Sequence, residues 1–300
     1  MSLALLLALV LQIETPVDSV AAVALTHARI DDAQAIELDP FGALYVADAG
    51  QHVIMKMDTT GRLLERLGGP GPREGSFDRP MDVDPTNGLV LLVADAGNGR
   101  IQMFSRSHAF LGSIPLAGGG QRAGEVTYRR RDDDPRIPAS GTPIAVASFG
   151  SNETYAIDAD RGVVLQWDGN RRLTRVIGDL DAGDGALSEP VSLWAGPESL
   201  LFVADRGRGE VVVFDAYGSY VRSLGSGLLR RLVAVTGRGR SVLAVLEDAI
   251  VVFDIRGRRH RTIQPNLTER LVDAAVAPDG TIYVLTATGI YRLTHRGRPD

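Results

Sequence analysis

The sequence predicts an all-β fold built from repeated four-stranded antiparallel units, and three observations carry that prediction. First, residues 80–112 contain four short runs of β-branched or apolar residues separated by Gly, Asn, Asp or Pro, which is typical of a meander of hairpins. Second, one such meander cannot bury both of its faces and needs copies of itself as neighbours. Third, the copies are present, because an aspartate closes the second strand of four successive units, in LYVAD, LLVAD, TYAID and LFVAD.

The spacing of these four aspartates predicts a propeller. Asp48 and Asp95 lie 47 residues apart, as do Asp158 and Asp205, whereas the middle interval is 63 residues because an Arg/Asp-rich segment is inserted at 118–140. Four strands at a period near ~45 residues are typical of propeller blades. Continued to the end of the chain, the pattern gives six blades. We therefore expect residues 17–300 to form one six-bladed β-propeller.

Each blade is assigned four strands in chain order, except the last, which has three. Turns between third and fourth strands carry Asp and Gly, which supply the turn chemistry. The expected strands are 35–39, 44–47, 54–58 and 63–67 in blade 1; 81–84, 90–95, 101–105 and 110–114 in blade 2; 144–148, 154–158, 163–167 and 173–177 in blade 3; 191–195, 200–204, 211–215 and 220–224 in blade 4; 232–236, 241–246, 250–254 and 260–263 in blade 5; and 271–277, 281–286 and 290–294 in blade 6.

An N-terminal strand is expected to complete the sixth blade. Residues 20–25, VAAVAL, read as a strand without a partner nearby in the sequence, and blade 6 lacks its fourth strand. A strand that fills this place joins the two ends of the chain and removes an open sheet edge. We expect the propeller to be closed in this way.

The N-terminus carries a short apolar run, LALLLALVLQI, at residues 3–13. It is too short for an ordinary membrane span and has the length of a signal-peptide hydrophobic region. Against that interpretation, no Lys or Arg precedes it and no small-x-small cleavage site follows. We expect residues 1–16 to be a signal peptide or another N-terminal extension. The expected location is extracytoplasmic, periplasmic or secreted, with the cytoplasm as the alternative and no transmembrane anchor.

Composition restricts the partners and the chemistry. The formal charge of −5 is mild, so nothing in it demands nucleic acid or an anionic membrane, and the loops hold few aromatic residues to stack on bases. Positive charge is nearly all arginine, and Lys56 is the only lysine. The absence of cysteine excludes disulfides, thiolate metal sites and a Cys nucleophile.

At the second unit the chain resembles the NHL-repeat propellers. The stretch VADAGNGRIQMF places Asp95, Asn98 and Arg100 at the family spacing, and LGGPGPREGSFDRP at 67–80 is similar to the family's glycine-rich inter-blade loop. The resemblance covers nearly the whole chain but decays along it, because the last two units lose the aspartate. It implies a six-bladed propeller that uses one face for binding.

The four recurring aspartates allow two interpretations. Carboxylates that converge on an axis could bind a hard cation. Alternatively, an aspartate at a strand end accepts hydrogen bonds from loop N–H groups and fixes the turn. Repetition favours the second interpretation, because a catalytic residue need occur only once.

Metal and nucleophile chemistry find little support. A zinc site needs three or four ligands brought together, and the strand assignment scatters the histidines, so we expect no catalytic metal and no cofactor. The segment DAGDG at 181–185 lacks the ligand spacing of a calcium loop, and no Gly-x-Ser-x-Gly elbow occurs. The histidines are His27, His52, His108, His260 and His295.

The inserted segment is the most individual feature, with four arginines flanking three aspartates. Arginine pairs bidentately with carboxylate or phosphate, which favours a recognition loop, although a solvated, partly self-paired insertion is an equal alternative. In propeller topology this segment leaves the same face as the loops after the second strands. The candidate ligand- or partner-binding residues are Asn98, Arg100, Arg129, Arg130, Arg131, Arg136, Arg206 and Arg208.

From these features we expect a monomeric, non-enzymatic module that binds a protein or a small anionic ligand through one propeller face. The alternative is a lactonase-like or lyase-like enzyme with a divalent metal in the central channel. RNA binding is a third hypothesis, and the acidic total charge counts against it.

Overall fold

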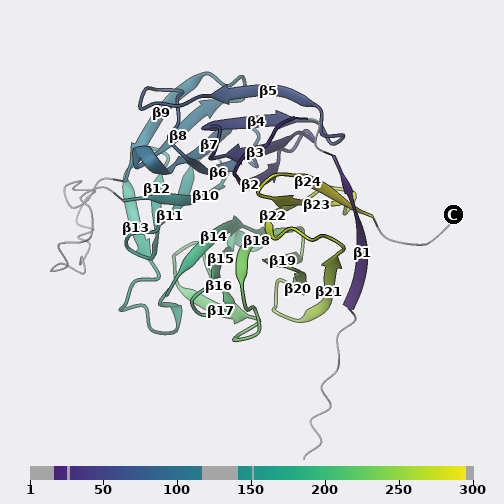
Figure 1. Ribbon diagram of the computed structural model, residues 1–300. Coiled ribbons are helices and arrows are strands. Elements are labelled where there is room, and N and C mark those ends of the chain that lie inside the picture. Colours follow the sequence, from purple (N-terminus) through teal and green to yellow (C-terminus); the bar gives the residue numbers. More distant parts are fainter. Residues whose placement is uncertain (1–16, 26–27, 117–140, 151, 295–300) are drawn as a thin grey trace, which may run out of the picture.

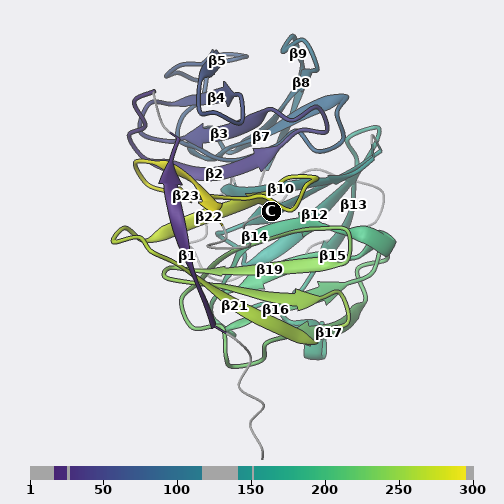
Figure 2. The ribbon, with the colours of Figure 1, turned by 90° about the vertical axis from the view of Figure 1, so that its right-hand side faces the viewer.

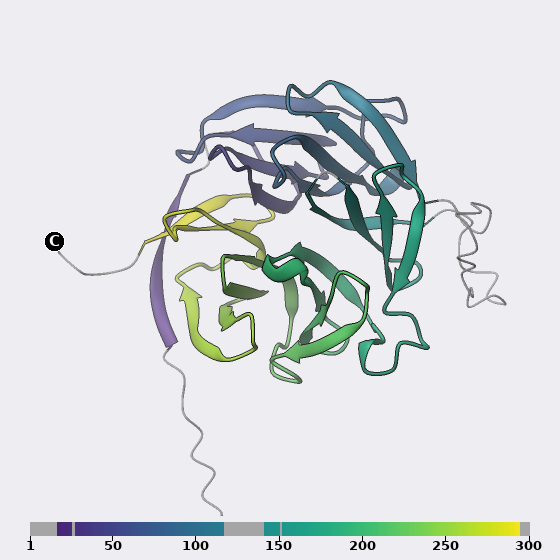
Figure 3. The same cartoon turned by 180° about the vertical axis from the view of Figure 1, so that it is seen from behind.

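The computed structural model describes residues 17–25, 28–116, 141–150 and 152–294, and within them the chain forms five sheets. Four sheets have four antiparallel strands each and are called blades 1 to 4. The fifth has eight strands, in the order β18-β19-β20-β21-β1-β24-β23-β22. Figure 1 shows the sheets arranged around a common centre, and Figure 3 shows the same ring from behind.

The strands agree with the predicted ones to within a few residues, so the predicted meanders are confirmed. Blade 1 contains β2 (Ala33–Leu38), β3 (Leu44–Asp48), β4 (Val53–Met57) and β5 (Leu63–Gly68). Blade 2 contains β6 (Pro80–Asp84), β7 (Val90–Asp95), β8 (Arg100–Ser105) and β9 (Phe110–Pro115). Blade 3 contains β10 (Pro143–Phe149), β11 (Glu153–Asp158), β12 (Val163–Asp168) and β13 (Leu173–Ile177). Blade 4 contains β14 (Pro190–Ala195), β15 (Leu201–Asp205), β16 (Glu210–Phe214) and β17 (Tyr220–Leu224).

The eight-stranded sheet consists of two meanders joined by β1. The first meander has β18 (Leu232–Arg238), β19 (Ser241–Leu246), β20 (Ile250–Asp254) and β21 (Arg259–Pro265). The second has β22 (Leu271–Val276), β23 (Ile282–Thr286) and β24 (Ile290–Thr294). The only helices in the described ranges are three single 3-10 turns, η1 (Ala96–Asn98), η2 (Gly183–Gly185) and η3 (Pro197–Ser199), and none is long or apolar enough to cross a membrane.

Strand β1 (Val17–Ala24) makes two kinds of pairing. Its second half runs antiparallel to β24, with Ala22 opposite Leu293, which is the pairing that the sequence predicted. Its first half runs parallel to β21, with Val17 opposite Thr262, which the sequence did not predict. Figure 2 shows β1, in purple, from the outside of the ring. The strand therefore covers the outer edges of two meanders instead of one.

The first strand of every meander lies next to the axis, and all six share one irregularity. Strands β2, β6, β10, β14, β18 and β22 contact one another in sequence, and β22 contacts β2. In each, the pairing with the following strand skips one residue, as between Pro80 and Asp82 in β6. A bulge re-aims the extra side chain. The skipped residues are Gln34, Met81, Ile144, Val191, Val233 and Val272, called the mouth ring below.

The core is a series of interfaces between neighbouring meanders. Between blades 1 and 2, for example, Phe77 and Phe104 pack edge to face with their ring centroids 5.9 Å apart. Val20 of β1 is buried between the two meanders of the eight-stranded sheet. Because each meander buries apolar side chains against both neighbours, the loops at the ends of the ring stand on a rigid support.

Candidate functional site

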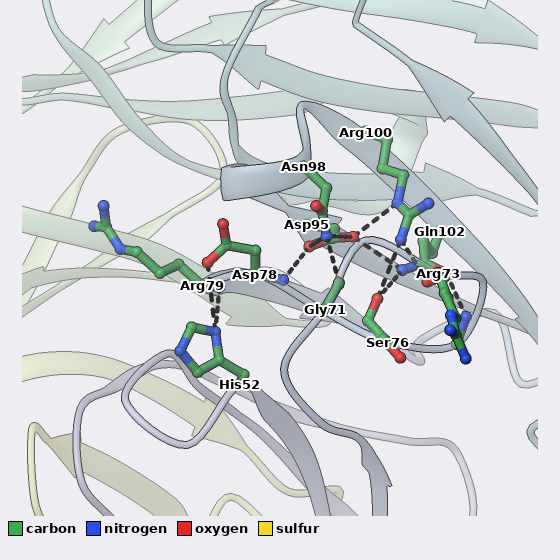
Figure 4. Close-up of polar contacts among 11 residues, drawn as sticks. His52, Gly71, Arg73, Ser76, Asp78, Arg79, Asp95, Asn98, Arg100 and Gln102 are labelled. Atoms are coloured by element: carbon green, nitrogen blue, oxygen red, sulfur yellow. Dashed lines mark hydrogen bonds and ion pairs between the residues drawn. The ribbon is translucent and has the colours of Figure 1, made fainter.

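A buried aspartate organises the loop above each of blades 1 to 4. In blade 2, Asp95 has no exposed surface and accepts hydrogen bonds from the backbone N–H of Asp78 at 2.7 Å and from Nε2 of Gln102 at 2.9 Å. Asn98 and Arg100 donate to the same carboxylate, at 2.9 and 2.8 Å. Figure 4 shows this network between β7, η1, β8 and the preceding inter-blade loop. The carboxylate fixes the loop, because its four donors come from three segments: the inter-blade loop, η1 and β8.

The equivalent aspartates act in the same way, which confirms the turn-fixing interpretation. Asp48 accepts from the N–H groups of Asp31 and Asp32, and Asp205 accepts from those of Ser188 and Glu189. Asp158 accepts from the guanidinium of Arg161. In the described part of the chain, no group of three or more His, Asp or Glu side chains is arranged to hold a metal ion.

The sequence-predicted binding residues are not equally placed for a ligand. Arg100 also donates to the carbonyls of Arg73 and Ser76, and Asn98 to that of Gly71, so both hold the inter-blade loop. Arg208 donates in the same manner to the carbonyls of Asp184 and Ala186, at 2.8 and 2.6 Å, and pairs with Glu210. These three side chains are engaged within the protein.

Of the remaining predicted residues, only Arg206 is placed by the structure. Its guanidinium is half-exposed, pairs with Glu189 at 2.5 Å and lies at the edge of a cavity. The hydrogen bond from Arg206 lowers the pKa of Glu189, so the pair is ionised at neutral pH. Arg129, Arg130, Arg131 and Arg136 lie outside the described residues. Leu116, the last described residue before them, donates its N–H to the carbonyl of Gly99.

The cavity beside Arg206 is the mouth of the axial space, with a volume of about 570 Å3. Its floor is the mouth ring, which is apolar except for Gln34. Its rim comes from the eight-stranded sheet and blade 4. The polar rim residues are Arg206, Glu247, Glu269 and Arg270. The site therefore combines an apolar floor with a charged rim of both signs.

Hydrogen bonds fix one of the two rim carboxylates, that of Glu269. Glu269 accepts from the hydroxyls of Thr286, Thr288 and Tyr291 at 2.7, 2.9 and 3.0 Å. The first of these bonds has the largest effect, and together they lower the pKa of Glu269 below its ordinary value. Nη1 of Arg270 lies 3.4 Å from Oε2 of Glu247, so this ion pair is loose, and the side chain of Arg270 is exposed. A ligand can therefore exchange with the partner of Arg270 at small cost.

Beneath the mouth ring lie four carboxyl groups that the sequence analysis missed. They face a narrower cavity of about 60 Å3 that shares the ring as its upper wall. Removal from bulk water raises the pKa of Asp82 to about 7 and that of Asp273 to about 8, and it also raises those of Glu37 and Asp84. In the sequence Asp82 and Asp273 look like ordinary strand residues, because only the strand pairing identifies the mouth-ring residues that precede them.

Two of these carboxyls connect neighbouring meanders. Asp82 accepts from the N–H of Val146 at 2.7 Å, and Asp273 from that of Ile36 at 2.9 Å. Ser192 holds the equivalent place in blade 4 and accepts from the N–H of Val235 at 3.2 Å. Polar residues at this position thus alternate with alanines around the ring and link the meanders in pairs.

The described histidines lie apart from the mouth. His52 accepts from the N–H of Arg79 at 3.0 Å, His260 lies 3.8 Å from a carboxylate oxygen of Asp254, and His108 is described below. His27 and His295 lie outside the described residues.

The geometry places the protein in the class of β-propellers, and comparison with known proteins agrees. No family model matches the chain, and no curated protein sequence matches it. Among solved structures, a streptogramin B lyase is 12% identical, with 92% of this chain and 97% of that one covered and a TM-score of 0.64. U3-55K is 11% identical, with 91% and 98% covered and a TM-score of 0.61. At such identity the likeness shows the fold alone.

Proposed function

We propose that this protein is a non-enzymatic module that binds a small anionic ligand, or an acidic segment of a partner protein, at the mouth of its axial cavity. The observation that carries the proposal is the mouth cavity itself. Its volume of about 570 Å3, its apolar floor and its few polar rim groups have the character of a ligand pocket. Arg206 and Arg270 supply donors for a carboxylate or phosphate at the rim.

A screen of small organic acids by thermal shift tests the proposal. Compounds that raise the melting temperature are compared between the wild type and Val191→Trp, which fills the cavity from the mouth ring. Tyr217→Trp is the matched control, since Tyr217 is 75% exposed in the turn between β16 and β17, on the opposite face. The proposal requires that compounds that raise the melting temperature of the wild type and of Tyr217→Trp no longer raise that of Val191→Trp. Equal effects in all three proteins would overturn it.

A lyase-like or lactonase-like enzyme is the second candidate function, and one observation favours it. Asp82 and Asp273 lie directly beneath the mouth ring with pKa values near neutrality, which suits a general acid or base. Mass spectrometry of hits after incubation with the protein separates the two functions. Compounds recovered unchanged support the binding module. A product that wild type forms and that Asp82→Asn does not form supports the enzyme.

For the whole fold, we propose a six-bladed, NHL-type propeller in which β18–β21 and β22–β24 are blades 5 and 6. Three features support it: the same bulge in all six inner strands, the continuous contacts between those strands, and the antiparallel pairing of β1 with β24. In this interpretation β1 is the fourth strand of blade 6. A crystal structure tests this proposal. If β1 pairs with β24 and leaves blade 5 separate, the proposal stands. If β1 pairs with β21 alone, the proposal is contradicted.

Location and the arginine-rich insertion complete the proposal. We propose that the apolar run at 3–13 directs export of a monomer, which cell fractionation and the mass of the mature protein test.

We also propose that the insertion contributes Arg129, Arg130 and Arg131 to capture of an acidic partner. Replacing the three by Ser should preserve the melting temperature and weaken capture, because charge steers such encounters.

A further inference from the structure

A second pocket lies between blades 1 and 2 on the face opposite the mouth. It has a volume of about 120 Å3 and is lined by residues from the start of β3, the end of β4 and the turn between β8 and β9. These strand ends are the ones farthest from Asp48 and Asp95, which mark the mouth face. The pocket is thus separate from the site described above.

Two lining residues of this pocket, Tyr45 and His108, belong to a hydrogen-bonded chain of three side chains that continues to Glu65 behind the wall. Nδ1 of His108 lies 2.9 Å from Oε2 of Glu65, and Nε2 of His108 lies 3.1 Å from the hydroxyl of Tyr45. The imidazole is buried, and His108 has a left-handed backbone with φ of 61°. If Nδ1–H donates to the carboxylate, Nε2 accepts from the Tyr45 hydroxyl. The wall is consequently fixed on both blades, since Glu65 and Tyr45 belong to blade 1 and His108 to blade 2.

Two cations face the pocket without a carboxylate partner in the described part of the chain. The ammonium group of Lys56 lies 5.3 Å from the centroid of the Tyr45 ring, and the guanidinium of Arg106 lies 3.8 Å from that of Phe41. Several other exposed arginines pair with carboxylates, as Arg240 does with Glu198 at 2.6 Å, whereas some, such as Arg66, donate to neutral oxygens. Asp39 also lines the pocket, but one of its oxygens already accepts from two N–H groups of its own turn. The Asp39 carboxylate keeps its charge, so what is left available to an anionic ligand is the donor capacity of Lys56 and Arg106 and not a net positive charge.

The rim of the pocket is apolar and exposed. Phe41 is 60% exposed and Leu89 is 63% exposed. Leu89 lies between the lining residues Gly88 and Val90. Large apolar side chains at a pocket edge add contact area for the uncharged part of a ligand. The volume equals that of about four water molecules at roughly 30 Å3 each, which suits a short organic acid.

We propose that this pocket binds a small organic carboxylate, with its anionic group held by Lys56 and Arg106 and its apolar body against Phe41 and Leu91. The Glu65–His108–Tyr45 chain positions the aromatic ring under Lys56 and is not itself a ligand contact. This site does not depend on the proposed function of the mouth, because the two share no lining residue.

The single lysine permits a direct test. Protein labelled with 13C and 15N at lysine gives one side-chain signal, from Lys56, and is titrated with butyrate and benzoate, with butylammonium chloride as the control for ionic strength. A saturable shift with the acids and none with the amine is expected. A shift that grows linearly with every salt would overturn the proposal.

A matched pair of variants locates the binding. Arg106→Ala should weaken butyrate binding about tenfold, the usual effect of losing one charge-assisted hydrogen bond. Arg256→Ala is the control, since Arg256 is exposed in the turn between β20 and β21 on the same face. It should leave binding unchanged. Equal affinities in the two variants, both still folded by circular dichroism, would contradict the assignment of Arg106.

Discussion

Asp95 shows how a single buried carboxylate determines the shape of a loop. Its donors lie before the β7–β8 hairpin, in its turn and on its second strand, so the inter-blade loop, η1 and β8 are held by one side chain. A buried charge of this kind is tolerated only when it is paired and its lone pairs are satisfied, as they are here by Arg100, Asn98 and Gln102. Removing it leaves the guanidinium of Arg100 without its counter-ion.

Asp95→Asn should therefore destabilise the protein by about 3–5 kcal/mol, the range for breaking a buried, hydrogen-bonded ion pair. Urea unfolding measures the difference. Asp181→Asn is the control, because Asp181 is exposed in an inter-blade loop. Identical urea midpoints for the two variants would refute the role given to Asp95.

The carboxyls beneath the mouth predict an unusual dependence of stability on pH. The pKa of Asp273 in the folded protein is about 8, well above the ordinary 3.8, chiefly because the group is removed from bulk water. A raised pKa means that the folded protein favours the protonated form of Asp273. The contribution of this group to the free energy of unfolding is therefore fully present below pH ~4 and is lost as pH rises through 8. Asp82, with a pKa of about 7, acts in the same direction.

The free energy of unfolding should consequently fall between pH 5 and pH 8.5, and Asp273→Asn should reduce the fall. The amide carries no charge at either pH and still accepts from the N–H of Ile36. Urea midpoints of both proteins at the two pH values measure the change. The same pH dependence in wild type and variant would contradict the assignment to Asp273.

The strands and the role of the recurring aspartates could be predicted because both depend on patterns of residues that are close in the sequence. Each strand lies within a run of alternating or apolar residues bounded by turn residues, so LLVAD and LFVAD were assigned as strands without knowledge of neighbours. The recurring aspartates were also understood, because some of their N–H donors belong to the turn that directly follows, such as Gln51 for Asp48 and Arg208 for Asp205. Asn98, Arg100 and Arg208 were expected to face a ligand, but the carbonyls they bind belong to loops some 20 or more residues earlier.

What the sequence did not predict depends on contacts between separate meanders. The parallel pairing of β1 with β21 joins Val17 to Thr262, and no local pattern signals it. The chain Glu65–His108–Tyr45 crosses from blade 1 to blade 2 for the same reason. Asp82 and Asp273 look like ordinary strand residues until the ring brings both to the axis.

At the scale of elements, β1 carries more stability than its length suggests. It pairs with two strands at once, Val20 is buried with 4% of its surface exposed, and the carbonyl of Leu25 occupies the space where a Cβ of Gly61 would lie. Without β1, the outer edges of β21 and β24 are open. Open edges pair with other chains.

Deleting residues 1–25 should therefore cost several kcal/mol, since each buried aliphatic side chain contributes about 1.5–3 kcal/mol, or it should cause aggregation. Deleting residues 1–16 keeps β1 whole and is the control. Differential scanning calorimetry and light scattering measure both effects. Equal melting temperatures for the two truncated proteins would show that β1 is dispensable.

At the scale of the whole molecule, the core is a ring of interfaces and has no single centre. Leu92 is buried between blades 2 and 3, whereas Val242 is buried between blade 4 and β18–β20, across the ring. A linear array of repeats can lose one end while the rest stays folded. In a ring joined through β1, loss of any interface exposes apolar surface on the two meanders that form it. We therefore expect the meanders to unfold together, with one common free energy of unfolding.

Leu92→Ala and Val242→Ala should each lower a single, shared unfolding transition. The cost for Leu92→Ala should be about 2–5 kcal/mol, the range for a large-to-small change in a packed core, and that for Val242→Ala should be smaller because fewer atoms are removed. Leu180→Ala is the control, since Leu180 is 66% exposed. Calorimetry shows whether one transition remains, and hydrogen exchange shows where protection is lost. If the meanders are cooperative, Leu92→Ala reduces protection in β15 and β19 as much as in β7 and β11. Loss confined to blades 2 and 3, with a second transition at the wild-type temperature, would mean that the ring unfolds in independent parts.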